Sequence, residues 1–270
     1  MRLMIPAGVA ALLMALGAPP SAAQDQPLPP LDVSNLSIPS VLATPDAPDY
    51  AAVLASPVRT DADRARDDAR QTLITLDFIG VQPGWKVADM IMGGGYFTRT
   101  LSAAVGPEGH VTAWQPAEFI AVEASYGEAA TAAQALPNVD VIRSPIGAPD
   151  FPTGLDLVFT AQNYHDLHLA PFADDTAARA NAAVFAALRP GGYYVIIDHH
   201  AVDGADAAVP DTLHRIDTER VIREVEAAGF VQSAMSPALW NDDDPRTANV
   251  FDPSIRGRTS QFMISFRKPE

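Results

Sequence analysis

The sequence contains no cysteine among its 270 residues. This excludes disulfide bonds, thiolate metal sites and cysteine nucleophiles. Positive charge is also scarce, because 18 lysine and arginine residues stand against 33 aspartate and glutamate residues, which gives a formal net charge of −15. An acidic protein surface repels phosphate backbones, so we expect no nucleic-acid partner.

Long apolar runs are rare as well, and the clearest one lies at the start of the sequence. Residues 3–17 are apolar and follow the basic Arg2, and Ser21-Ala22-Ala23 fits a small-residue cleavage site. This pattern predicts a signal peptide over residues 1–23 and export, with the periplasm as the expected location; an uncleaved anchor is the alternative. No later stretch is long enough for a membrane helix, so we expect no membrane span after cleavage. Nothing in the sequence indicates an oligomeric state.

The remainder divides into an arm and one domain. Residues 24–57 are rich in proline, alanine, serine and aspartate and lack periodicity, which is typical of a linker or an N-terminal arm. Residues 58–270 alternate between apolar and amphipathic segments. With 48% hydrophobic residues, the chain can bury the core of one such domain.

The alternation predicts a mostly parallel sheet with helices on both faces, which is an α/β, Rossmann-like, doubly wound fold. The expected strands are residues 86–92, 110–114, 140–143, 155–161, 193–198, 230–236 and 261–267. The expected helices are residues 60–78, 96–105, 117–136, 176–188 and 217–228, and residues 189–192 are an expected turn. In such sheets the ligand binds beyond the carboxyl ends of the strands, so the functional residues should follow the strands directly.

Candidate ligand-binding residues follow the first two strands. Asp89 and the Gly93-Gly94-Gly95 turn come after the first strand, where glycine lets the backbone approach a ligand and the next helix offers free N–H groups. A glycine turn without a ligand is the alternative. Gln115 follows the second strand, at the place where a carboxylate usually binds ribose, and its amide can still hydrogen-bond to a hydroxyl.

Histidines gather after the later strands. Asn163 follows a strongly apolar strand, and five of the six histidines lie in this and the following carboxyl-end loops, namely His165, His168, His199, His200 and His214. As a group they indicate proton transfer near neutral pH or a divalent metal. The sequence has no HxxxH or HExxH pattern, so we assign no metal ligands from it. A solvated loop with a helix cap is the alternative.

Three motifs resemble the class I S-adenosylmethionine-dependent methyltransferases, namely residues 87–95, 155–159 and 188–192. The closest resemblance is to a bacterial group of exported predicted methyltransferases, through residues 163–167, 198–200, 213–217 and 256–262. The resemblance implies a seven-stranded methyltransferase sheet with an antiparallel last strand and S-adenosylmethionine as the cofactor. It implies that Asp89 and the Gly93-Gly94-Gly95 turn surround the methionine part, that Gln115 lies at the ribose, and that Asn163 lies near the transferring end. Ile91 replaces the family's first glycine, and Gln115 its acidic residue.

Methyl transfer needs a base only when the acceptor must lose a proton. We expect His165 to be that base, with His199 and His214 as alternates, and a small molecule or protein as the substrate. The alternative function is a non-catalytic protein on the same fold that binds a small ligand or a metal. Residues 241–258 have little periodicity and are either a lid over the site or an exposed acidic loop.

Overall fold

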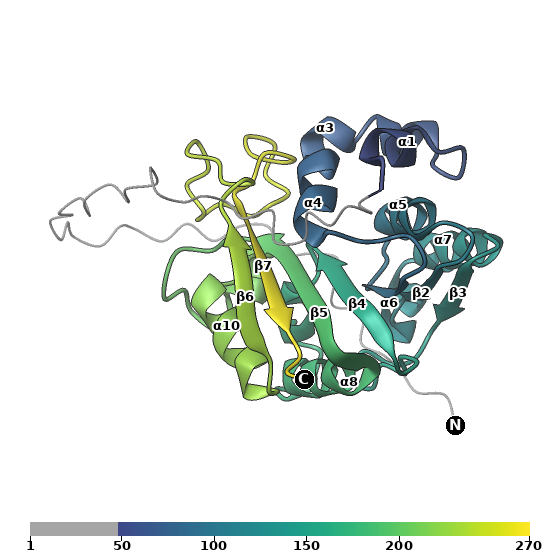
Figure 1. Cartoon of the computed structure of the whole chain (residues 1–270). Coiled ribbons are helices and arrows are strands. Elements are labelled where there is room, and N and C mark those ends of the chain that lie inside the picture. Colours follow the sequence, from purple (N-terminus) through teal and green to yellow (C-terminus); the bar gives the residue numbers. More distant parts are fainter. Residues whose placement is uncertain (1–47) are drawn as a thin grey trace, which may run out of the picture. The chain divides into compact units, whose positions relative to one another are not determined.

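A single seven-stranded sheet organises residues 48–270, which are the residues described by this computed structural model (Figure 1). The strand order is β3-β2-β1-β4-β5-β7-β6. The strands are β1 Lys86–Met90, β2 His110–Trp114, β3 Val139–Ile142, β4 Leu155–Ala161, β5 Leu188–His199, β6 Val231–Ser236 and β7 Gln261–Arg267. β1 to β5 pair in parallel, while β7 runs antiparallel to both β5 and β6. This confirms the expected α/β sheet with an antiparallel last strand. The expected signal peptide and residues 24–47 of the arm lie outside the described residues.

Helices cover both faces of the sheet. The helices are α1 Tyr50–Ala55, α2 Asp61–Arg64, α3 Asp67–Arg70, α4 Thr72–Ile79, α5 Tyr96–Val105, α6 Ala117–Val122, α7 Ala124–Gln134, the 3-10 helix η2 His165–His168, α8 Thr176–Ala187, α9 Val209–Leu213 and α10 Thr218–Ala227. Neighbouring residues of β1 point to opposite faces. Val87 packs in a core cluster with α4, α5 and α7, and Ala88 packs in a second cluster with α8 and α10. Continuous apolar strands are therefore buried on both sides.

The N-terminal helical region differs from the single helix expected over residues 60–78. It breaks into α2, α3 and α4, and Gln71 between α3 and α4 has a left-handed φ of 46°. The last part of the expected arm, residues 50–55, is the helix α1. Asp49 caps α1 by accepting hydrogen bonds from the amides of Ala51 and Ala52, and Val53 of α1 lies in the core cluster with α4 and α5.

Three further segments differ from expectation. The helix expected over residues 117–136 is two helices, because Glu123 adopts an extended conformation and its carboxylate caps α7 at the amide of Ser125. The turn expected at residues 189–192 lies within β5 as an irregularity, where the register between β4 and β5 shifts and Gly191 has a φ of 72°. α9 was not expected, because five residues are too few to show a helical period.

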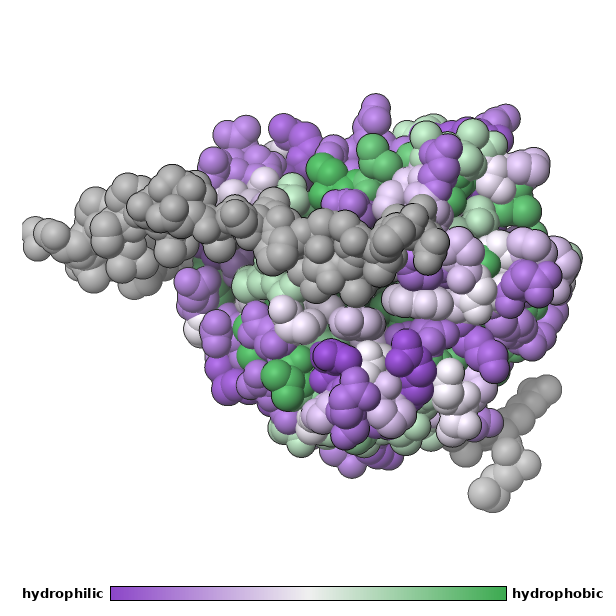
Figure 2. Space-filling view, in the orientation of Figure 1, coloured by the Kyte–Doolittle hydropathy of each residue, from purple (hydrophilic) through white to green (hydrophobic). Residues whose placement is uncertain are grey.

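The described surface is mainly polar. Figure 2 shows one face, on which hydrophilic residues predominate and hydrophobic ones form small patches. Large exposed apolar side chains are scattered over several elements, for example Leu73 on α4, Val122 on α6 and Val231 on β6. No helix within residues 48–270 is long and apolar enough to cross a membrane.

The segment between β6 and β7, which includes the expected lid, is fixed by a buried ion pair. Arg215 donates to both oxygens of Asp244 at 2.8 and 2.9 Å, and neither side chain is exposed to solvent. Asp244 also accepts a 2.6 Å hydrogen bond from the amide of Ser260, at the start of β7. A backbone bond from Val250 to Leu213 holds the middle of the segment against α9. Residues 241–258 are thus attached to the domain at both ends and in the middle.

We predict that Asp244→Ala lowers the free energy of unfolding by about 3–5 kcal/mol, because it leaves the Arg215 guanidinium buried without its partner. Burial alone would raise the pKa of Asp244, but hydrogen bonds from Arg215 and from backbone amides hold it below its usual value. The pair therefore stabilises the fold above the ordinary aspartate pKa of about 4, and this stabilisation is lost as the pH falls below that value. Urea unfolding at several pH values measures both effects. The exposed neighbour provides a control, since Asp243→Ala should have little effect; equal losses in both variants would contradict the prediction.

Candidate active site

The turn after β1 has the left-handed backbone conformation that glycine favours, although its first residue is Ile91. Ile91 has a φ of 61°, a left-handed conformation that is rare for a β-branched residue. Its side chain is 2% exposed and lies in the core cluster on the α8 and α10 face. Gly93 and Gly95 also have positive φ, of 53° and 77°. The isoleucine thus adopts the backbone conformation that a glycine would favour, and its side chain is placed in the core.

The backbone of this turn is open on one side. A Cβ built on Gly93 or on Gly94 would meet no atom within 4 Å, so a ligand can approach the main chain there. Gly95 differs, because a Cβ there would lie 2.7 Å from the Arg99 guanidinium. Arg99 donates to the Gly94 carbonyl at 3.1 Å and to both oxygens of Asp63 at 2.6 Å. The open turn is therefore tied to α2.

Asp89, at the carboxyl end of β1, is buried directly beneath this turn. It is 3% exposed and accepts a 2.5 Å hydrogen bond from the Thr98 hydroxyl of α5. Burial raises the pKa of Asp89 to about 6, against the opposing effects of Thr98 and of the Arg70 and Arg99 charges. The carboxyl group is thus held in place without a direct ion pair and can accept a hydrogen bond from a ligand amine.

Gln115 is the most unusual polar residue of the site. It lies directly after β2 and has no solvent exposure. Neither its Nε2 nor its Oε1 atom has a hydrogen-bond partner within the described part of the chain. Buried amides in folded proteins are nearly always paired, and leaving one unpaired costs about 1–3 kcal/mol. Gln115 therefore offers both a donor and an acceptor at the position expected for a ribose hydroxyl.

Asn163 connects the ends of the two central strands. Its Nδ2 atom donates to the Ile91 carbonyl at 2.9 Å and to the Ala161 carbonyl at 2.8 Å. The first bond supports the left-handed turn after β1, and the second closes the end of β4. Gln162, between Ala161 and Asn163, has a φ of 64°. Asn163 thus places the polar run after β4 against the glycine turn.

The structure brings the three predicted catalytic histidines together. The His165 ring centroid lies 6.1 Å from that of His199 and 5.5 Å from that of His214. His165 is 3% exposed, and its Nδ1 atom lies 2.8 Å from Asp198 Oδ1. Its Nε2 atom lies 3.3 Å from Asp166 Oδ1.

The charges of these groups differ sharply. Burial alone would lower the pKa of His165, but the carboxylates of Asp198 and Asp166 raise it to about 9, so this ring is protonated at neutral pH. Burial lowers the pKa of His199 to about 3, and its Nδ1 atom is 2.7 Å from the Thr259 hydroxyl. The pKa of His214 is lowered mainly by burial and to a lesser degree by the positive charge on His165. His214 is therefore the neutral member whose ring nitrogens have no hydrogen-bond partner within residues 48–270.

The two remaining histidines of the carboxyl-end loops have other surroundings. His168 lies between Glu224, at 3.0 Å, and Arg220, at 2.7 Å. The His200 ring packs against Trp240 and Phe262, with centroids 5.4 and 5.9 Å away. These contacts account for the position of His168, whereas the Nδ1 atom of His200 is buried without a hydrogen-bond partner within the described residues.

Strained backbone is concentrated at this edge of the sheet. Among residues 48–270, five residues other than glycine have a positive φ. Three of them are Ile91 after β1, Gln162 after β4 and His214 after α9. Such conformations cost free energy and tend to occur at functional sites. The strain thus occurs at the edge of the sheet that also holds Asn163 and the histidines.

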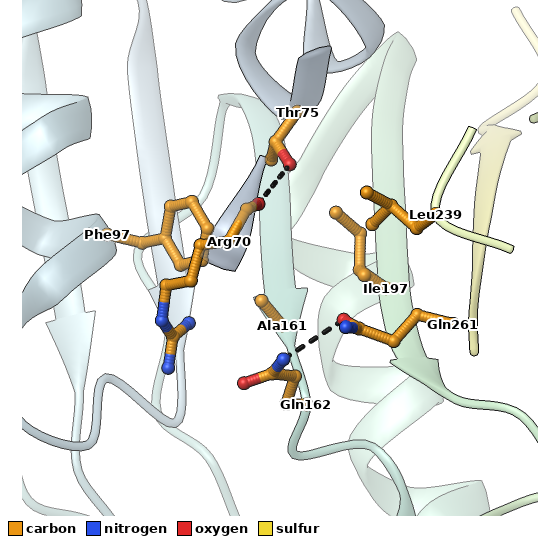
Figure 3. A pocket seen from close by; sticks show the side chains of 8 residues that line it. All are labelled: Arg70, Thr75, Phe97, Ala161, Gln162, Ile197, Leu239 and Gln261. Carbon is orange, nitrogen blue, oxygen red and sulfur yellow. Dashed lines mark hydrogen bonds between the residues drawn. The ribbon is translucent and has the colours of Figure 1, made fainter. Parts of the chain in front are cut away.

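A small pocket adjoins the site between α3, α5 and the ends of β4 and β5 (Figure 3). Its free volume is about 10 Å³, which suits one water molecule. It is lined by Arg70, Thr75, Phe97, Ala161, Gln162, Ile197, Leu239 and Gln261. The Arg70 guanidinium carbon lies 4.8 Å from the Tyr96 ring centroid, and the side chain has no ion pair within the described residues. Sequence reasoning missed Arg70, because no local pattern separates it from the other arginines of this region.

The comparisons with known proteins identify the fold. Comparison with protein-family models and with curated proteins gives no match. Solved structures are similar: a methyltransferase dependent on S-adenosylmethionine (SAM) from Aquifex aeolicus has a TM-score of 0.52 and 18% identity, over 81% of this chain and 98% of that one. The N-methyltransferase NodS from Bradyrhizobium japonicum has a TM-score of 0.51 and 15% identity, over 78% and 98%. This chain has the methyltransferase fold.

The same fold also occurs in a protein described by another reaction. The [4+2]-cyclase SpnF has a TM-score of 0.53 and 17% identity, over 74% of this chain and 80% of that one. At such identities the likeness shows the fold alone. Function must therefore be argued from the residues of the site.

We predict that Gln115→Leu raises the free energy of unfolding of the ligand-free protein by about 1–3 kcal/mol, because it removes a buried amide without partners. Gln134 provides the contrast. Its Nε2 atom donates to the Val139 carbonyl at 3.2 Å, and its Oε1 atom accepts from the Val141 amide at 2.9 Å. Gln134→Leu should therefore destabilise the fold. Chemical denaturation compares the two variants, and a loss of stability in Gln115→Leu would show that its amide is paired.

Proposed function

We propose that this protein is a SAM-dependent methyltransferase that acts on a small molecule or a protein outside the cytoplasm. The observation that carries the proposal is the buried, unpaired amide of Gln115 beside an open glycine turn. Both features fit a nucleoside ligand: the amide would bind a ribose hydroxyl, and the turn admits a ligand against the main chain. The fold of the structural neighbours supports this reading.

The described residues fit the cofactor as a set. Asp89 would accept a hydrogen bond from the amino group of its methionine part, next to the Gly93-Gly94-Gly95 turn. Arg70, a cation without an ion pair and electrostatically coupled to Asp89, would meet the carboxylate of the same part. Asn163 would hold the turn at the transferring end through the Ile91 carbonyl. When bound, the cofactor supplies an electrophilic methyl group on a sulfonium.

The protein's own contribution to the reaction is positioning. Methyl transfer is an in-line displacement, so its rate depends on the alignment of two reactants and on the exclusion of water. The acceptor would lie against His165, His199 and His214, beyond the ends of β4 and β5. His165 is protonated and His199 is hydrogen-bonded and held neutral by burial, so His214 is the member with a lone pair available to the acceptor.

A second candidate is a non-catalytic protein that binds a small ligand or a metal on the same fold. The observation that favours it is the convergence of His165, Asp166 and His214. These side chains could bind a metal cation as well as a methyl acceptor. Binding of S-adenosylhomocysteine together with methyl transfer to any acceptor would separate the first candidate from the second. Export itself rests on residues 1–23. An intact Met1 on the mature protein would contradict cleavage of the signal peptide, and recovery of the protein in the cytoplasmic fraction would contradict export.

We predict that the purified protein binds S-adenosylhomocysteine and that Gly94→Ala weakens this binding about tenfold or more. In the free protein the added methyl group meets no atom within 4 Å, and Gly94 has no positive φ, so the variant should keep its stability. The methyl group would occupy the space in which the ligand approaches the backbone. Calorimetric titration measures the affinity, and thermal unfolding measures the stability.

The control is Gly127→Ala on α7, a helix that packs against β3. The added methyl group would contact only Ile120, at 3.3 Å, so this variant should bind like the wild type. If the wild type shows no binding, the cofactor assignment is overturned. If Gly94→Ala binds as tightly as Gly127→Ala, the assigned location is wrong.

A further inference from the structure

Three side chains that can bind a metal converge beyond the ends of β4 and β5. His165 and Asp166 begin the 3-10 helix η2, and His214 ends α9. Each offers one ligand atom, and the three atoms all lie within 4.8 Å of one another. Small side-chain shifts would bring all three atoms to about 2.0–2.2 Å from one ion, the bond length of zinc to nitrogen or oxygen ligands. The residues come from two separate segments of the chain.

His214 is held in this position at some cost. Its φ is 55°, a left-handed conformation that an ordinary helix end would assign to glycine. Its amide donates to the Pro210 carbonyl at 3.2 Å, and its ring packs edge-on against Phe251 with centroids 4.9 Å apart. Within residues 48–270 no hydrogen-bond partner satisfies either ring nitrogen. The ring of His214 is therefore held in place by packing and has a nitrogen lone pair that no hydrogen bond occupies, as a metal ligand requires.

Asp198 fixes the orientation of His165. Its Oδ1 atom lies 2.8 Å from His165 Nδ1, and its Oδ2 atom accepts a 2.7 Å hydrogen bond from the His165 amide. With Nδ1 engaged in this way, Nε2 is the atom that faces Asp166. A carboxylate bound to the far nitrogen of a histidine is the usual support of a metal ligand, because it sets the tautomer and the ring orientation.

The negative charge of two nearby carboxylates also favours the binding of a cation. Asp166 has 14% of its side chain exposed and Asp198 has none, so two carboxylates lie in a largely dehydrated site around one imidazole. We propose that His165, Asp166 and His214 bind one divalent transition-metal ion, of which Zn²⁺ is the type case. Binding of the ion displaces the proton that His165 carries on Nε2 in the free protein, because only a deprotonated ring nitrogen can be a metal ligand. Two histidines and one carboxylate are a ligand set of catalytic zinc sites, which keep a further coordination position open. Asp198 is then a positioning residue for His165.

The open position would serve the acceptor. This role rests on the proposed function, whereas the metal site itself does not. With the ion bound, His214 is a ligand, and the ion takes the place of its lone pair in contacting the acceptor. His165 follows Asn163 by two residues, so the ion would lie next to the transferring end assigned to Asn163. An acceptor oxygen bound to the ion would be both oriented and made more acidic, which is what a methyl acceptor needs before it reacts.

The test is metal binding by the untagged full chain after treatment with a chelator. Calorimetric titration with Zn²⁺ should show one ion per chain, and Co²⁺ should give the visible absorption of a metal bound to nitrogen. His214→Ala, at a half-buried position, should lose at least about tenfold in affinity together with the Co²⁺ absorption, and thermal unfolding checks that the variant is folded. Asp198→Asn should lose about 10- to 100-fold, as expected for a supporting carboxylate.

His110→Ala is the matched control, because His110 lies at the start of β2 with 41% of its side chain exposed, and it should bind metal like the wild type. Failure of the wild type to bind Zn²⁺, or equal binding by His214→Ala and His110→Ala, would overturn the proposal. S-adenosylhomocysteine binding is measured on the same samples. Its retention in His214→Ala shows that loss of the metal is separate from loss of the cofactor site.

Discussion

The amide of Asn163 is the interaction on which the site depends most. It joins the carboxyl ends of β1 and β4, the strands at which the order of the sheet reverses, by donating to the Ile91 and Ala161 carbonyls. The first bond helps to hold a left-handed backbone that isoleucine alone would disfavour. The second sets the exit of the chain towards His165 and Asp166. One side chain therefore fixes both halves of the site, the glycine turn and the histidine cluster.

Ile91 shows how a departure from a motif can leave the geometry intact. The conformation at this position is required by the turn, and its side chain finds room in the core on the α8 and α10 face. The left-handed conformation of Ile91 raises the free energy of the folded state, and the packing of its side chain and the Asn163 hydrogen bond must offset this strain. Gln115 departs from the family pattern in another way, because an uncharged amide stands where the family has an acidic residue. This amide has no hydrogen-bond partner in the ligand-free protein.

Much of the fold follows from local pattern. The central strands could be predicted because they are continuous apolar runs, and β7 was placed at its observed bounds, Gln261–Arg267. The short helices α1 and α9 could not, since five or six residues show no period. The gathering of His165, His199 and His214 was foreseen, because residues after parallel strands meet at one edge. Their protonation was not, since it depends on Asp198 and Asp166, whose distances only the folded chain sets. Residues 241–258, expected to be either a lid or an exposed acidic loop, are bound to the domain through the Arg215–Asp244 pair, a contact across 29 residues that no local pattern contains.

The central claim is that a nucleoside cofactor binds across the glycine turn and Gln115. Backbone and side-chain amide NMR signals of the protein, recorded during addition of S-adenosylhomocysteine, test it most directly. We expect the largest shifts at the amides of Gly93, Gly94 and Gly95 and at the side-chain amide of Gln115. An absence of shifts at these four residues, or shifts confined to residues outside this edge of the sheet, would contradict cofactor binding at this place.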